Sequence, residues 1–194
     1  PDWQGMLACI LRQGTPRRVH HFELGLDTEI QTAICERYDV LSGLDPDDPY
    51  YPLRRKMLLA SFLGYDYVIC GLDGMEWPRR RVAVQDTSTL AREGGRSFVN
   101  EHFGPITNWQ DFECYPWPDP LRASTRSLEW YEANLPENMC IIAGELANFC
   151  AYTVQLMGYE TLCYSLYDQR ELVQAISERL LETFRVALKR MLAF

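Results

Sequence analysis

Three acidic side chains come at or directly after apolar stretches that are typical of strands: Glu23, Asp73 and Glu145. A carboxylate at the end of a strand can accept a proton or bind a cationic substrate group. Each has a structural alternative. Glu23 could form a salt bridge, Asp73 could form a turn before Gly74, and Glu145 could cap a helix.

His21 and Tyr152 are two further candidates for substrate binding. His21 lies two residues before Glu23, so the two side chains would share one face of a strand. A lone histidine is also a common structural residue, and Tyr152 could equally pack in a core. His20 would point to the opposite face, and His102 lies far along the chain. We therefore expect no metal site from this segment alone.

Apolar stretches alternate with helical patterns along the chain. Residues 19–24, 66–72 and 139–143 are predicted to be strands, with helices between them. The continuous apolar run at 67–70 suits a parallel sheet that is covered on both faces. We predict a single α/β domain over residues 1–194. Three βα units fit the N-terminal half of a (β/α)8 TIM barrel, and a complete small open sheet is the alternative.

The stretch from residue 74 to residue 105 interrupts this alternation. Residues 81–84 and 96–99 are predicted to pair as a β-hairpin. The following residues, 109–120, are rich in Trp and Pro and are predicted to form a loop, which either packs on the protein or contacts a partner.

The last stretch, residues 168–194, is predicted to be an amphipathic helix. Asp168 and Glu171 have the spacing of a capping box. Leucine, isoleucine and phenylalanine recur every four residues: Leu172, Ile176, Leu180, Phe184, Leu188 and Leu192. A wide apolar stripe needs a surface to bury against. With a first residue that is not Met, this suggests a segment of a larger enzyme.

Composition excludes some classes of protein. The 194 residues carry a net charge of −8, which argues against a nucleic-acid or anionic-membrane surface. No apolar run is long enough to suggest a membrane span. The seven cysteines are widely spaced and include no CxxC pair, which favours free thiols in a reducing compartment. We expect a cytoplasmic protein.

Four segments in order resemble the first half of the uroporphyrinogen decarboxylase-like superfamily: residues 17–24, 63–68, 109–120 and 156–168. The resemblance implies a (β/α)8 barrel. It also implies one of two activities. One branch decarboxylates uroporphyrinogen without a cofactor, and the other transfers methyl groups between corrinoid proteins and thiols or folates, commonly with zinc.

The resemblance also implies roles for two residues. In the decarboxylases, a catalytic Asp follows the second strand and accepts hydrogen bonds from pyrrole N–H groups, and Asp73 is the nearest match. A functional Tyr of that branch has a spacing similar to that of Tyr152 after Gly144. The methyltransferase branch takes its zinc from residues in the second half of the barrel, so zinc and a corrinoid partner are implied for a complete enzyme.

The segment after the first predicted strand favours the methyltransferase branch. The decarboxylases have an arginine-rich loop there, because arginine neutralises the carboxylates of the substrate. This chain has Glu23 and Asp27 instead. We expect corrinoid-linked methyl transfer from a small methylated substrate, with catalytic roles for Glu23 and Asp73 and binding roles for His21, Glu145 and Tyr152. Decarboxylation is the first alternative. The second is a non-catalytic half-barrel that binds a partner or forms a homo-oligomer.

Overall fold

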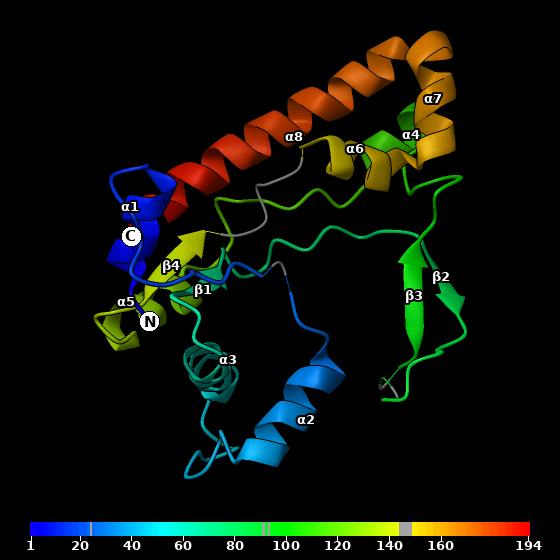
Figure 1. Cartoon of the computed structure of the whole chain (residues 1–194). Helices are drawn as coiled ribbons and strands as arrows, with labels where there is room; N and C mark the ends of the chain where they lie inside the picture. The colour runs from blue at the N-terminus through cyan, green and yellow to red at the C-terminus, as the bar shows by residue number, and fades with distance from the viewer. Residues whose placement is uncertain (24, 91, 93, 144–148) are drawn as a thin grey trace. The chain divides into compact units, whose positions relative to one another are not determined.

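The computed structural model describes residues 1–23, 25–90, 92, 94–143 and 149–194. These residues form a mixed α/β structure with eight helices and two small two-stranded sheets (Figure 1). The strands that are described form no closed barrel. The chain divides into two compact units. The first comprises Pro1–Cys70, Ser88–Glu93 and Ser127–Ile142, and the second comprises the rest.

The first unit holds most of six elements: α1 (Trp3–Ile10), α2 (Thr28–Tyr38), α3 (Tyr51–Phe62), β1 (Tyr67–Cys70), α5 (Arg126–Asn134) and β4 (Cys140–Ala143). Asp2 caps α1 by accepting a hydrogen bond from the Gly5 N–H at 2.9 Å. α3 begins with a proline in its first turn, where the missing N–H costs nothing. β1 pairs with β4, as expected for two apolar stretches of equal length.

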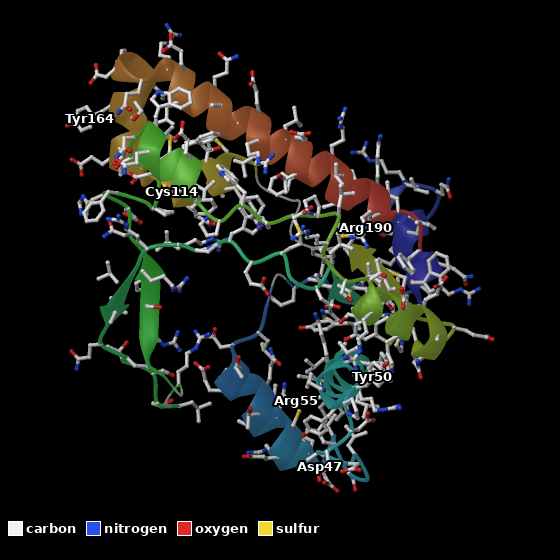
Figure 2. The ribbon with its side chains drawn as sticks, turned by 180° about the vertical axis from the view of Figure 1, so that it is seen from behind. Asp47, Tyr50, Arg55, Cys114, Tyr164 and Arg190 are labelled. Atoms are coloured by element: carbon white, nitrogen blue, oxygen red, sulfur yellow. The ribbon has the colours of Figure 1, made fainter. Side chains whose placement is uncertain are left out.

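Aromatic side chains join α3 and α5 in the first unit. The buried Tyr131 donates a hydrogen bond from its hydroxyl to the carbonyl of Leu53 at 3.2 Å. Trp130 stacks on Tyr50, with ring centroids 5.8 Å apart, and Arg54 lies over the same indole. Tyr50, labelled in Figure 2, directly precedes α3. These contacts fix the helix that carries one wall of the pocket described below.

The second unit contains the hairpin and four helices. β2 (Arg81–Val84) and β3 (Arg96–Val99) pair antiparallel, with Arg81 opposite Val99. This confirms the predicted hairpin, including its bounds. The helices are α4 (Trp109–Cys114), α6 (Phe149–Met157), α7 (Tyr159–Asp168) and α8 (Arg170–Met191).

The core of the second unit forms where α6 and α8 pack against Trp77 and Tyr115, which come after β1 and before α5 in the sequence. Leu172, Ile176 and Leu180 of α8 are fully buried there. Further along α8 the buried residues are Thr183, Ala187 and Met191, whereas Leu192 is 73% exposed. A step of four residues advances about 400° around a helix, so a four-residue repeat drifts off the buried face. Near its end, α8 is tied to the loop before α5, because Arg190 donates to the carbonyls of Pro120 and Ala123 (Figure 2).

Three sequence predictions were wrong. Residues 19–23 form no strand, because they contact β1 through side chains and not through a backbone ladder. Gln169, not Asp168, is the residue before α8, and no side chain caps that helix. Part of the predicted Trp/Pro-rich loop is helix α4, which Asn108 caps by accepting a hydrogen bond from the Asp111 N–H at 3.0 Å.

Among the described helices, none is long and apolar enough to cross a membrane.

Candidate binding pocket beside Glu23

A pocket of about 300 Å³ lies in the first unit, between α3, β1 and the segment that follows residue 22. Its apolar lining comes from Leu26, Leu59, Ala60, Leu63, Val68 and Ile69. Its polar lining comes from Glu23, Gln31, Lys56, Tyr65 and Tyr67. Leu59, Ala60 and Val68 are buried, whereas Glu23 and Lys56 are exposed. The pocket thus has an apolar floor and two opposite charges at its mouth.

Tyr67 of β1 fixes the backbone of Glu23. The Glu23 N–H donates to the Tyr67 hydroxyl at 2.9 Å, and the same hydroxyl donates to the Glu23 carbonyl at 3.1 Å. A hydroxyl can serve in both ways at once, so it replaces the backbone ladder of a true strand. The Phe22 ring stacks on the Tyr67 ring at 5.1 Å and holds the segment from its other side.

The charges and rings at the mouth lie close to one another. Burial, together with the negative charge of Glu23 and the neighbouring Tyr67, raises the pKa of the Tyr65 hydroxyl. Tyr65 and Tyr67 stack with their centroids 5.9 Å apart. Lys56 donates to the carbonyl of Ile69, which places its ammonium group at the β1 side of the pocket. An anionic residue, a cationic residue and two tyrosines therefore line the same pocket.

A buried charged cluster lies next to this pocket in the sequence, at Asp66. The Asp66 side chain is fully buried, and it accepts hydrogen bonds from Arg18 and from the backbone N–H of Asp2. The His20 Nδ1 atom lies 2.8 Å from the other carboxylate oxygen. Both oxygens of the carboxylate are thus engaged, as a buried charge requires. The cluster ties the N-terminal segment to the start of β1.

Asp66 stays ionised although it is buried. Burial by itself raises the pKa of this carboxyl. The hydrogen bonds from His20 and the Asp2 N–H, with the positive charge of Arg18, outweigh burial and hold the pKa of Asp66 below its usual value. Burial and the Asp66 charge raise the pKa of the nearby Cys140 thiol, which therefore stays protonated and poorly nucleophilic at neutral pH.

The structure places two of the predicted site residues on one segment of the first unit. Glu23 lines the pocket. His21 is exposed and lies on the same segment. The histidine with a buried carboxylate partner is His20, which was not selected as a site residue from the sequence. Asp66 could have pointed to it, because Asp66 directly precedes the most apolar predicted strand. A carboxylate that is buried there requires hydrogen-bond donors such as a histidine.

The other predicted residues lie elsewhere. Asp73 is exposed in the second unit, where its backbone N–H and carbonyl both pair with Ser124 at 2.9 Å. Tyr152 is buried among rings of the second unit, 5.1 Å from Trp77 and 5.0 Å from Phe184, with Arg79 over its face. Glu145 lies outside the described residues.

Among the described residues, no three His, Cys, Asp or Glu side chains converge in a way that could hold a metal ion. All cysteines of the chain are free thiols. These residues therefore offer no zinc site, and the resemblance puts the ligands of its zinc in the second half of a barrel.

Comparisons with family models, with curated proteins and with solved structures found no match for this chain.

Proposed function

We propose that the chain forms part of a uroporphyrinogen decarboxylase-like enzyme that transfers a methyl group from a small substrate to a corrinoid on a partner protein. The half-barrel architecture belongs to this proposal. The observation that carries it is the pocket beside Glu23, which is small, mostly apolar and bordered by a carboxylate. Such a pocket favours a small methylated molecule over a large, many-fold carboxylated porphyrinogen.

The arginine nearest to Glu23 on that segment supports the same choice. Arg18 is committed to the buried Asp66 carboxylate. A porphyrinogen decarboxylase needs arginines that face its substrate, and the pocket lining contributes Lys56 as its one cationic side chain among the described residues. The charge balance at this opening therefore disfavours a polyanion.

Methyl transfer from an ammonium group requires no general acid in the pocket. The bond between the methyl carbon and a substrate heteroatom breaks, the electron pair stays on the heteroatom, and the acceptor supplies the pair for the new bond. A methylated ammonium leaves as a neutral amine, so no proton has to be added to it. Glu23 would hold the cationic group in place, and the apolar floor would exclude water from the reacting atoms.

The test measures methyl transfer directly. The purified full-length protein that contains this chain is mixed with methylcobalamin and a thiol or a folate, and in parallel with reduced cobalamin and methylated amines, while visible absorbance follows the corrinoid. Thiol- or folate-dependent loss of methylcobalamin, or its formation from an amine, supports the proposal. Glu23→Gln should lower kcat/KM at least about tenfold, as expected for loss of a charge-assisted contact.

A matched control is Glu36→Gln, which removes an exposed carboxylate from α2 that does not line this pocket. It should leave the rate unchanged. No corrinoid reaction under any of these conditions would refute the proposal. Turnover of uroporphyrinogen that Asp73→Asn abolishes would establish the decarboxylase alternative.

A further inference from the structure

The mouth of the pocket beside Glu23 carries one negative and one positive side chain, and its floor is apolar. Glu23 and Lys56 are the charged residues of the lining. Lysine is rare in this chain: Lys56 and Lys189 are its two lysines, against seventeen arginines. Lys56 therefore gives the pocket a compact ammonium group, whereas most cationic side chains of this protein are guanidinium groups.

From this arrangement we infer that the pocket binds a small zwitterion with an apolar body, that is, an apolar α-amino acid or its N-methylated form. The ammonium group of the ligand faces Glu23, its carboxylate faces Lys56, and its side chain lies on the floor formed by Leu59, Ala60 and Val68. This inference rests on the proposed function in one respect, namely that this pocket is the substrate site.

Each part of the ligand has a counterpart on the protein. A methylated ammonium is recognised by a carboxylate together with an aromatic face, and Tyr65 lines the pocket beside Glu23 with one side of its ring against Tyr67. The carboxylate of an amino acid accepts hydrogen bonds from an ammonium group, which Lys56 brings to the β1 side. Because the ammonium and the carboxylate of the ligand are both bonded to its α-carbon, they lie close together, and a site of about 300 Å³ has room for both charged groups and the side chain.

The side-chain preference follows from the floor. Leu59, Ala60 and Val68 are 5%, 8% and 2% exposed, and none of them offers a hydrogen bond. A polar ligand side chain would lose its water without gaining a partner there. An aliphatic side chain of the size of leucine gains from leaving water. The same floor therefore disfavours glycine, serine and their derivatives.

The experiment is a calorimetric titration of the purified full chain with four probes that share the same isobutyl group. L-Leucine and N-methyl-L-leucine carry both charges, isoamylamine carries the positive charge alone, and 4-methylpentanoate carries the negative charge alone. The two zwitterions should bind at least about tenfold more tightly than either singly charged probe. Equal binding of all four, or no saturable binding of the zwitterions, would overturn the inference.

Two charge variants assign the roles. Glu23→Gln should weaken the binding of isoamylamine and of the zwitterions but not the binding of 4-methylpentanoate. Lys56→Met should weaken the binding of 4-methylpentanoate and of the zwitterions but not the binding of isoamylamine. Lys56→Arg keeps the charge and should retain most of the binding. Glu36→Gln and Lys189→Met are matched controls that should bind like the wild type. Charge variants that bind as the controls do would also overturn the inference.

The result separates the inference from the proposed function. Leucine carries no methyl group to transfer and the titration contains no corrinoid, so binding does not depend on methyl transfer. Zwitterion binding without any corrinoid reaction would refute the proposed function alone. A corrinoid reaction in a protein that binds the singly charged probes as well as the zwitterions would refute the ligand class alone. Should a charge variant fail to fold, the four-probe series on the wild type still decides the ligand class.

Discussion

The Nδ1 atom of His20 lies 2.8 Å from a carboxylate oxygen of Asp66, and the two side chains are 7% and 0% exposed. The pair joins residues 46 positions apart and closes the N-terminal segment onto the start of β1. Arg18 and the Asp2 N–H complete the shell around the same carboxylate. This cluster and the Tyr67 hydroxyl, and not a strand ladder, hold the segment that carries Glu23.

Asp66→Asn should lower the free energy of unfolding by about 2–4 kcal/mol, because it leaves Arg18 and His20 beside a neutral group at a buried site. Urea unfolding followed by circular dichroism measures the change. Asp47→Asn is the matched control, since Asp47 is exposed in the turn before α3 (Figure 2), and it should change stability by less than about 0.5 kcal/mol. A similar loss in both variants would contradict the role given to Asp66.

Asp66 should also make stability depend on pH in the acidic range. Its pKa in the folded protein lies below the value of about 3.9 in an unfolded chain, so the unfolded state binds the proton more tightly. Its contribution is present above about pH 4 and is lost as the pH falls through the folded-state pKa. The stability difference between wild type and Asp66→Asn, measured from pH 7 to pH 3, should therefore shrink in acid. A constant or growing difference would show that the Asp66 charge is not stabilised.

Gly104→Ala should lower the free energy of unfolding by about 2–4 kcal/mol. A Cβ at this position would clash with the Leu156 carbonyl group and lie 2.7 Å from the Met157 carbonyl carbon, because the Gly104 N–H donates to the Met157 carbonyl at 2.6 Å. Gly25→Ala is the control, since a Cβ there meets nothing within 4 Å. Thermal or urea unfolding compares the two. Equal stability of the two variants would mean that the loop and α6 can move apart at little cost.

Tyr115 should make stability depend on pH in the alkaline range. Burial raises its pKa to about 12, against the opposing charge of Arg79, while its hydroxyl donates to the Pro78 carbonyl at 3.0 Å. The folded state binds the proton more tightly than an unfolded chain with a pKa near 10, so the contribution is full below about pH 10 and is lost between about pH 10 and 12. Tyr115→Phe should cost about 1 kcal/mol at pH 7, and this cost should diminish above pH 10.

Unfolding measurements at pH 7, 9, 10 and 11 on wild type and Tyr115→Phe test this dependence. Tyr164→Phe serves as the control, because Tyr164 is 65% exposed on α7 (Figure 2). Its stability should follow that of the wild type at every pH. If Tyr115→Phe also parallels the wild type above pH 10, then the Tyr115 phenol does not ionise late in the folded protein.

Local patterns predicted most of the elements. The hairpin at Arg81–Val84 and Arg96–Val99 was predicted with its bounds, because β-branched and aromatic residues alternate there between turn residues. β1 and β4 were predicted from continuous apolar runs. The strand that did not form has a clear cause: residues 19–23 resemble a strand locally, but a strand exists only where a neighbour supplies the ladder, and here Tyr67 supplies a side chain instead.

Some residues of the candidate site were predicted from the sequence, and others were not. Sequence analysis selected Glu23 from its place after an apolar stretch, and the structure gives it a pocket. It selected His21 from the alternation of a strand, but the histidine that meets a buried partner is its neighbour His20. Lys56 was not selected at all, because nothing in a helical pattern distinguishes a lysine at a pocket mouth from one in solvent.

The sequence by itself determined the mixed α/β class, the hairpin, the long amphipathic helix at residues 170–191 and the acidic balance of the chain, since these depend on periodicity and composition within short windows. Only the tertiary structure decided that His20, and not His21, pairs with Asp66. It also decided which residues of α8 are buried beyond Leu180, and it brought Glu23 and Lys56 to the lining of one pocket. Each of these depends on contacts between residues far apart in the chain, and burial at such contacts is set by the fold as a whole and not by any local pattern.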